Sequence, residues 1–348
     1  MGRVGLWPLA RAYGAVVRLR SNAYDRGWAR VERVSVPVIS LGNLSVGGTG
    51  KTPLVEKICR LLQADGLRAA VVSRGYRRRG GERVTVVSRG DGRGPVVGPD
   101  AAGDEPFLLA GHLPSAAVVV SPDRVEAART AIELGAEIVV ADDAFQHRRL
   151  ARQIDFLVVD ATNPTETGRL LPSGRLREPL DAAGRASAFL ITRCDRIGHT
   201  TRVRTLFRGL NPTAPFFETI ARPTRLLLPD DASVEPDRLV DERVVAFCGI
   251  GSPRFFLEDL QRLGARVEAF LPFPDHHWFT DDDLARVAER ARALRSTYVI
   301  TTEKDHVRLS EKQRGLIKLH RLRIGAEFRE ECQLLKFLRK RLGREEAA

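Results

Sequence analysis

The sequence has 348 residues, of which 43% are hydrophobic and 29% charged, enough for two domains of roughly 100 to 200 residues with separate cores. Intrinsic disorder and fibrous repeats are therefore excluded as overall descriptions. The net charge is +12, and because the excess of arginine and lysine lies mainly in residues 1–35 and 311–348, it fits an anionic membrane surface or simple solubility better than nucleic acid.

Residues 1–30 predict an amphipathic segment at a membrane interface. Apolar and aromatic side chains are mixed with arginines, and the longest uncharged run within residues 3–20 covers only residues 4–10. A bilayer-spanning helix needs about 20 apolar residues, and the segment also lacks the apolar core and cleavage site of a signal peptide. Two interpretations remain open with equal weight: peripheral binding among lipid headgroups, and a helix packed on the protein's own core.

Residues 31–222 predict a doubly wound α/β domain. A β-branched, apolar strand at 33–41 runs into the loop GNLSVGGTGKTP, and a helical pattern follows from residue 54 to the glycine at 66. Further strands are expected at 68–73, 116–121, 137–141, 154–159 and 188–192, with a helix at 122–134. This alternation is typical of a parallel sheet covered by helices on both faces. The stretch after Tyr76 is expected to be a long polar excursion.

The glycine-rich loop has the composition of a nucleotide-phosphate loop. Such a loop needs glycines that let backbone N–H groups converge on phosphate oxygens, a lysine for the β and γ phosphates, and a hydroxyl for magnesium. We expect the phosphates of a nucleotide to bind here, and the residues of the loop are Ser45, Val46, Gly47, Gly48, Thr49, Gly50, Lys51 and Thr52. Ser45 stands where the strict pattern has its first glycine, and a glycine-rich turn without function is the alternative.

An apolar strand at 137–141 leads into two carboxylates, Asp142 and Asp143. A P-loop enzyme uses carboxylates at such a position to hold Mg²⁺, directly or through water, so we predict a magnesium site formed with Thr52. The alternative is an acidic turn. Gln146 and His147 follow and are expected to enter the same crevice, where ligands of open α/β sheets bind.

Three further clusters gather polar residues at predicted strand ends or loops. They contain Ser73, Arg74 and Tyr76 in SRGY, Asp104 and Glu105 in GDEP, and Arg177 and Glu178 in LPSGRLREPL. Asp104 could accept a proton from an attacking hydroxyl, or cap a helix that starts at Pro106. Arg175, Arg177 and Glu178 could bind an anionic substrate or phosphate, although a solvated ion pair is the commoner role of such runs.

Residues 223–242 are rich in proline and aspartate and predict a linker, after which residues 243–348 predict a smaller α/β lobe. Expected strands are 244–248, 265–270 and 298–301, and expected helices are 252–263 and 280–294. The segment FPDHHWFT places His276 and His277 next to acidic residues. A metal site is the weaker interpretation because adjacent side chains point apart, and a histidine that orients a carboxylate base is the stronger one. Glu303, Lys304 and Asp305 of TTEKD should face any cleft.

These motifs together resemble the tetraacyldisaccharide 4'-kinase family, the lipid A kinases of Gram-negative bacteria. The matching segments, in the family's order, are GNLSVGGTGKTP, SRGY, GDEP, DDAFQHRRL, LPSGRLREPL, FCGIGSPRFF, FPDHHWFT and TTEKD. The family also has Ser or Thr at the place of Ser45. Ala144 stands where members often have glycine, which removes no functional group, and the arginines of the first segment imply peripheral attachment.

The resemblance implies two α/β/α lobes joined by a two-stranded linker. It also implies transfer of the ATP γ-phosphate, with Mg²⁺, to the 4′-hydroxyl of a tetraacylated glucosamine disaccharide 1-phosphate at the cytoplasmic face of the inner membrane. Lys51 and the loop amides would hold the phosphates, Asp104 would be the base, and His276 rather than His277 would assist it. The expected partners are the glycolipid and the membrane surface, without nucleic acid or an obligate protein partner. A P-loop NTPase switch that acts on a protein is the rival interpretation.

Overall fold

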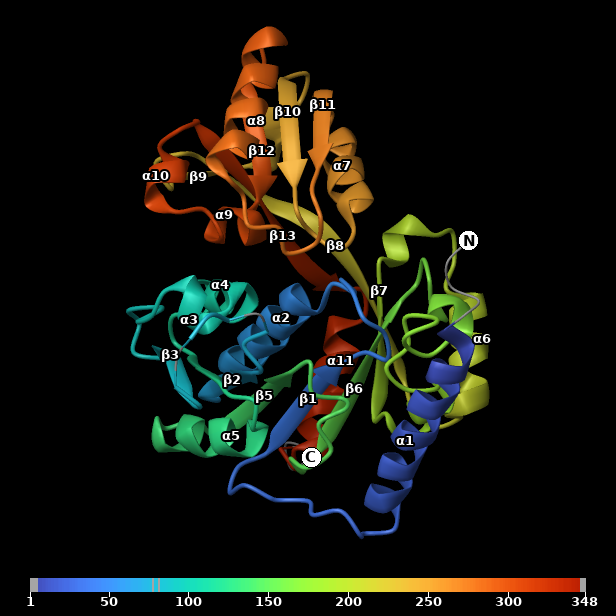
Figure 1. The fold of residues 1–348 in the computed structure, drawn as a ribbon. Coiled ribbons are helices and arrows are strands. Elements are labelled where there is room, and N and C mark those ends of the chain that lie inside the picture. The colour runs from blue at the N-terminus through green and yellow to red at the C-terminus, as the bar shows by residue number, and fades with distance from the viewer. Residues whose placement is uncertain (1–5, 77, 81, 345–348) are drawn as a thin grey trace. The chain divides into compact units, whose positions relative to one another are not determined.

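The computed structural model describes residues 6–76, 78–80 and 82–344 (Figure 1). The chain divides into two compact units, the first formed by Met1–Ala221 with Ala326–Ala348 and the second by Arg222–Gly325. Strands β8 (Phe216–Leu227) and β13 (Leu319–Phe328) each begin in one unit and end in the other. These two strands are therefore the chain connections between the units.

The first unit is built on a mostly parallel sheet with the strand order β8-β7-β6-β1-β5-β2-β4-β3. Its other strands are β1 (Val38–Gly42), β2 (Ala69–Ser73), β3 (Thr85–Arg89), β4 (Ala117–Val120), β5 (Ile138–Asp142), β6 (Ile154–Asp160) and β7 (Ala188–Thr192). Strand β3 runs antiparallel to its neighbour β4. Strand β1 lies at the centre, where Leu41 is in register with Asp142 of β5 and Phe156 of β6.

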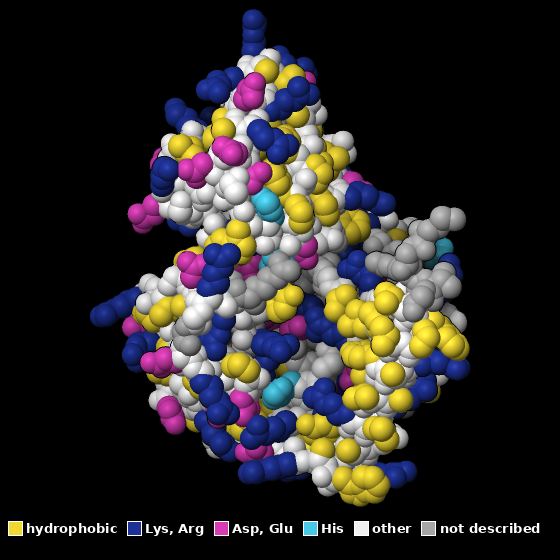
Figure 2. Space-filling view, viewed as in Figure 1, with side chains coloured by type: hydrophobic (Ala, Val, Ile, Leu, Met, Phe, Trp, Pro, Cys, Tyr) yellow, Lys and Arg dark blue, Asp and Glu magenta, His cyan; other side chains and the backbone are white. Residues whose placement is uncertain are grey.

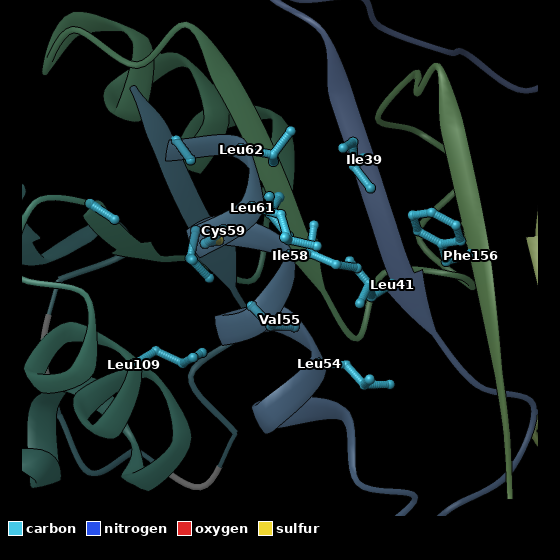
Figure 3. Packing of buried hydrophobic residues seen from close by; sticks show 14 of the residues in the cluster. Ile39, Leu41, Leu54, Val55, Ile58, Cys59, Leu61, Leu62, Leu109 and Phe156 are labelled. Carbon is cyan, nitrogen blue, oxygen red and sulfur yellow. The ribbon is translucent and has the colours of Figure 1, made fainter. Parts of the chain in front are cut away.

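Alternate side chains of each strand face opposite layers of helices. On one face, Ile39 and Leu41 of β1 pack against Leu54 and Ile58 of α2, as Figure 3 shows; on the other face, Val38 shares a cluster with α5. The helices of the unit are α1 (Trp7–Asp25), α2 (Lys51–Ala64), α3 (Pro99–Ala102), α4 (Asp104–His112), α5 (Arg124–Glu133), α6 (Thr201–Leu210) and α11 (Glu331–Arg341). The predicted doubly wound α/β architecture is confirmed.

The second unit repeats this layering on a smaller scale. Its strands are β9 (Ser233–Val234), β10 (Arg243–Cys248), β11 (Arg266–Pro272) and β12 (Tyr298–Thr302), and its helices are α7 (Pro253–Arg262), α8 (Asp281–Ala293), α9 (Glu303–Val307) and α10 (Glu311–Arg314). Strand β10 lies between β11 and β12, all parallel. Val244 of β10 packs in the cluster that contains α7, and Val245 in the cluster that contains α8.

Three expectations about chain organisation differ from the structure. Residues 326–348, expected in the C-terminal lobe 243–348, belong to the first unit, because Leu334 and Leu338 of α11 are buried in its core. The expected linker 223–242 contains the end of β8 and the short strand β9, which pair with each other. The expected polar excursion after Tyr76 contains β3, which pairs along the edge of β4. Within the described residues, no helix is both long enough and apolar enough to cross a membrane.

Candidate active site

Several predicted site residues of the first unit lie where parallel strands end. Strands β1, β5, β2 and β4 are consecutive neighbours and run in the same direction. Their carboxyl ends therefore meet at one edge of the sheet, the usual position of the ligand crevice in open α/β sheets. This topology brings together the phosphate loop after β1, the two aspartates at the end of β5, SRGY after β2 and the start of α5 after β4.

The phosphate loop connects β1 to α2, which begins at Lys51. Gly47 and Gly50 have φ angles of 120° and 77°, in a region that glycine enters without steric cost. A Cβ atom at Gly47 would collide with the guanidinium of Arg175. Thr52 is half-buried in the first turn of α2. The loop thus has the strand, glycine turn and helix that phosphate binding requires.

Three side chains from outside the loop hold three of its carbonyl groups. Arg175 Nη2 donates to the Val46 oxygen at 2.7 Å, Arg193 Nη2 to the Gly48 oxygen at 2.7 Å, and Thr192 Oγ1 to the Thr49 oxygen at 3.1 Å. In a planar trans peptide the next residue's N–H points opposite to the carbonyl. Fixing these carbonyls therefore fixes the direction of the N–H groups of Gly47, Thr49 and Gly50, which are the candidate phosphate donors.

Lys51 is held by two neighbours. Its Nζ donates to Asn43 Oδ1 at 2.8 Å and lies 3.2 Å from Asp143 Oδ1. The other carboxylate oxygen of Asp143 accepts from Arg177 Nη1 at 2.8 Å. Burial alone would raise the pKa of Asp143, but Lys51 and Arg177 outweigh it and hold that pKa well below its usual range. Asp143 is therefore an ionised carboxylate between two cations.

Asp142 has a different environment from its neighbour. It is 2% exposed, and its Oδ2 accepts from Ser73 Oγ at 3.1 Å. Burial, with the charges of Glu105 and Asp143, raises its pKa above the ordinary range. Within the described residues, Asp142 Oδ1 has no hydrogen-bond partner. A buried oxygen of this kind costs free energy, and a Mg²⁺ ion or its bound water would satisfy it, so the donor set of Asp142, Asp143 and Thr52 fits magnesium.

The SRGY and GDEP segments pack against each other. A Cβ atom on Gly75 would lie 3.1 Å from the Ala102 oxygen, and one on Gly103 would lie 3.3 Å from the Tyr76 oxygen. Asp104 is the first residue of α4 and not a cap of a helix that starts at Pro106. The side chains of Arg74 and Tyr76 are exposed, whereas those of Asp104 and Glu105 are half-buried.

The remaining candidates of the first unit support one another or nearby groups. Gln146 Nε2 donates to the Asn43 oxygen at 3.0 Å. Glu178 is buried and forms an ion pair with Arg185, so its carboxylate is engaged inside the protein and is not a solvated member of a surface pair. Burial, followed by nearby arginines, lowers the pKa of His147 to about 4, so this imidazole is neutral at physiological pH.

Sequence reasoning missed two residues of this site. Asn43 is 1% exposed and contacts Lys51, Ser45 and Gln146 at once. Arg124 is 4% exposed at the start of α5, and its pKa is lowered to about 10 by burial, which the charges of Asp142 and Asp143 oppose. The available signal was their place directly after β1 and β4, since the ends of neighbouring parallel strands converge.

In the second unit, the two adjacent histidines have different surroundings. His277 Nε2 lies 2.8 Å from Asp283 Oδ2, and its ring stacks on Phe273 with centroids 5.0 Å apart. Asp283 also closes the capping box with Thr280 at the start of α8. His276 has a left-handed backbone with φ of 59°, and its Nε2 lies 3.9 Å from Asp275 Oδ1. Within the described residues, no cluster of three or more His, Cys, Asp or Glu could hold a metal.

Helix α1 packs on the loops that carry these groups. Tyr13 Oη donates to the Arg177 oxygen at 2.9 Å, and Arg20 Nη2 to the Gln146 oxygen at 3.1 Å. Ala10 and Gly14 are buried on the same face. The opposite face exposes Leu9, Val16 and Leu19 by 59%, 65% and 69%. One face of the amphipathic segment thus packs on the protein, and the other face is apolar and exposed. Binding among lipid headgroups stays a prediction.

Comparisons with known proteins identify similar proteins of one family. The family model described as tetraacyldisaccharide-1-P 4'-kinase matches residues 3–343. A protein named tetraacyldisaccharide 4'-kinase from Anaeromyxobacter dehalogenans (strain 2CP-C) is 44% identical over 303 residues, which cover 85% of this chain and 79% of that protein. A protein of the same name from Syntrophus aciditrophicus (strain SB) is 39% identical, with coverages of 87% and 83%.

A solved structure extends the similarity to the fold of almost the whole chain. The crystal structure of LpxK from Aquifex aeolicus in complex with ATP superposes with a TM-score of 0.78 at 32% identity, covering 98% of this chain and 100% of that one. These similarities favour the kinase interpretation over the NTPase switch.

Proposed function

Because the chain belongs to the tetraacyldisaccharide-1-P 4'-kinase family, we propose that it transfers the γ-phosphate of ATP to the 4′-hydroxyl of a tetraacylated glucosamine disaccharide 1-phosphate, forming the lipid IVA precursor of lipid A. The observation that carries the proposal is the phosphate loop itself. Its carbonyls are fixed by Arg175, Arg193 and Thr192, and Lys51 Nζ lies 3.2 Å from Oδ1 of Asp143, which follows β5. Phosphoryl transfer depends on this kind of positioning and charge neutralisation.

In the proposed reaction, the loop amides and Lys51 bind the β and γ phosphates of ATP. Asp142, with Asp143 and Thr52, would hold Mg²⁺, which supplies charge neutralisation on the phosphate oxygens when bound. Asp104 accepts the proton of the 4′-hydroxyl while the oxygen of that hydroxyl bonds to the γ-phosphorus. The bond between the γ-phosphorus and the β,γ-bridging oxygen breaks, which releases ADP. His276 is proposed to orient that base or share its proton.

We assign the acceptor side to polar groups around the loop ends. Arg74 and Tyr76 are exposed and are proposed to contact the glycolipid directly, with Glu105, His147 and Arg177. The remaining proposed members are Ser73, Gln146 and Glu178, and their hydrogen bonds to Asp142, Asn43 and Arg185 support a role in shaping this surface.

Membrane attachment is proposed to be peripheral, at the cytoplasmic face of the inner membrane. Leu9, Val16 and Leu19 lie on one exposed arc of α1, and Arg11 and Arg18 are exposed beside it. Figure 2 shows the hydrophobic side chains gathered over this helix in the first unit. Apolar side chains flanked by arginines suit the headgroup zone of an anionic bilayer, and a lipid substrate would be met there.

Transfer of labelled γ-phosphate from ATP and magnesium to the tetraacylated disaccharide 1-phosphate tests the proposal. We expect labelled lipid with the unmodified protein and none with Lys51→Ala, because that substitution removes the positive charge that is proposed to contact the β and γ phosphates. Lys57→Ala, on the same helix but paired with Glu331, is the matched control and should retain activity. ATP hydrolysis without lipid labelling would contradict the proposal.

The role of Asp104 has its own test. Asp104→Asn should lower kcat by a factor on the order of 100 or more, as loss of a general base does, while the KM for ATP changes little. An equal loss in both parameters would make Asp104 a binding or structural residue instead.

A further inference from the structure

A buried ion pair in the second unit holds both backbone polar groups of one residue, Gly249. Asp305 is 0% exposed and Arg308 is 4% exposed, and Arg308 Nη1 donates to Asp305 Oδ1 at 2.9 Å. The same carboxylate oxygen accepts the N–H of Gly249 at 3.0 Å. The same guanidinium nitrogen donates to the carbonyl oxygen of Gly249 at 2.9 Å. The pair therefore holds Gly249 at both its N–H and its C=O, and Asp305 does not face a cleft as its strand-end position predicted.

The second carboxylate oxygen of Asp305 is held as well. Thr302 Oγ1 at the end of β12 donates to Asp305 Oδ2 at 2.6 Å, and the Asp305 N–H donates back to Thr302 Oγ1 at 3.1 Å. The aspartate is thereby fixed to the end of a buried strand. Gly249, which follows β10, is tied through it to the neighbouring strand β12.

The backbone of the DHH turn is hydrogen-bonded to the same residue, Gly249. The His276 N–H donates to the Gly249 oxygen at 2.9 Å, and His276 has the left-handed backbone, with φ of 59°, that a residue with a Cβ adopts only at some cost. The turn also lies flat on Gly249, where a Cβ atom would be 3.1 Å from both His277 Cβ and the Pro274 oxygen. The position of His276 is therefore determined by a carbonyl that Arg308 and Asp305 fix.

We infer that Asp305 and Arg308 are positioning residues for His276 and act through the backbone of Gly249. The inference rests on the proposed catalytic role of His276 and explains why the motifs FCGIG, DHH and TTEKD occur together in one chain. The three motifs form one hydrogen-bonded group: Asp305 of TTEKD orients Gly249 of FCGIG, and Gly249 accepts the His276 N–H of DHH. A buried ion pair that only stabilised the fold would not need both of its members bonded to the backbone of one residue beside the histidine.

A double-mutant cycle on kcat tests the inference. We expect His276→Ala to lower kcat by about tenfold or more and Asp305→Asn to lower it by a similar factor, each with the KM for ATP within about twofold of the unmodified value. Because Asp305 acts through His276, the double variant should be no slower than His276→Ala alone. Losses that multiply in the double variant would overturn the inference.

Further variants separate positioning from folding. Gly249→Ala keeps every polar group and forces the turn to move by a few tenths of an ångström, so it should reproduce the loss in kcat even if Asp305→Asn fails to fold, with a melting temperature close to that of the unmodified protein. Asp283→Asn, which releases His277 instead of His276, is the matched control and should leave kcat within about twofold.

The failure of the inference and the failure of the proposed role of His276 give different results. If His276→Ala slows the reaction while Gly249→Ala and Asp305→Asn do not, His276 acts without this support and the inference is overturned alone. If His276→Ala retains full kcat, the catalytic role and the inference both fail.

Discussion

Lys51 is engaged by Asn43 and Asp143 in the structure, so a nucleotide phosphate must compete with a carboxylate for the same ammonium group. Sequence reasoning placed Lys51, Asp142 and Asp143 together because strand ends converge in a parallel sheet. It could not predict that the two aspartates differ, since Ser73 lies 69 residues from Asp142 and Arg177 lies 34 residues from Asp143. Such partners are set by the fold and not by local sequence.

The raised pKa of Asp142 makes stability depend on pH. The folded protein holds this proton at pH values where the unfolded chain, with an ordinary Asp pKa of about 4, has lost it. The resulting contribution to stability is present at low pH and is lost as the pH rises through the raised pKa. Asp142→Asn should therefore raise the melting temperature of the nucleotide-free protein at pH 8 more than at pH 5. Calorimetry at both pH values tests this.

Magnesium binding at Asp142 should also depend on pH. Mg²⁺ with ATP should raise the melting temperature of the unmodified protein more at pH 8 than at pH 6, because the ion requires the ionised carboxylate. The increment that magnesium adds should be lost in Asp142→Asn. An Asp142→Asn protein that keeps it would show that the ion binds elsewhere.

Arg193 contacts both a buried carboxylate and the phosphate loop. It forms an ion pair with the buried Asp160 and donates to the Gly48 oxygen at 2.7 Å. Arg193→Lys keeps a positive charge for Asp160 but loses the planar fork that reaches both groups. We expect the KM for ATP to rise about tenfold, corresponding to about 1.4 kcal/mol, with a small change in melting temperature. Arg202→Lys, on the exposed face of α6, is the control. Equal KM values for both variants would contradict a role of Arg193 in holding the Gly48 carbonyl.

Among the elements, α1 has the most divided role. Its inner face holds the backbone of Arg177 and Gln146, and its outer face carries the exposed apolar arc. The arginines and the apolar spacing of residues 1–30 predicted an amphipathic helix, but which arc packs on the protein depends on the tertiary contacts. Strand β3 was not predicted from the sequence. It is a short edge strand with polar residues on both sides, and its strand structure depends on pairing with β4.

The outer face of α1 should control membrane binding. Val16→Glu with Leu19→Glu removes two apolar side chains, each worth roughly 1.5–3 kcal/mol when fully buried, and should lower binding to anionic vesicles by a factor on the order of 100. The control is Asn22→Glu, exposed on the same helix, which adds one negative charge outside the arc where the double variant adds two within it. Unchanged vesicle sedimentation of the double variant would discard the interfacial role.

At the level of the whole molecule, the chain returns to its first unit at its end. The α/β alternation and the second lobe were predictable because each strand and helix has its own periodicity. The return of α11 was not, because an amphipathic helix at the end of a chain does not specify the core on which it packs. Leu334 is 0% exposed, and its cluster contains Phe156 and Leu190 from the sheet of the first unit.

Loss of this contact should destabilise the first unit. Leu334→Ala should lower the free energy of unfolding by about 2–5 kcal/mol, the usual cost of deleting a buried leucine side chain. Cys332→Ala, on the exposed side of the same helix, should change it by less than about 0.5 kcal/mol. Urea unfolding followed through a probe in the first unit measures both, and equal effects would contradict the assignment of α11 to that core.

The central claim is that ATP turnover is coupled to phosphorylation of a glycolipid hydroxyl. The most direct measurement is the amount of ADP formed together with the ³¹P NMR spectrum of the lipid product. We predict about one new phosphate monoester, at the 4′ position and with the 1-phosphate intact, for each ADP released, in line with the transfer mechanism. ADP formation accompanied by free inorganic phosphate and an unchanged lipid would contradict the account.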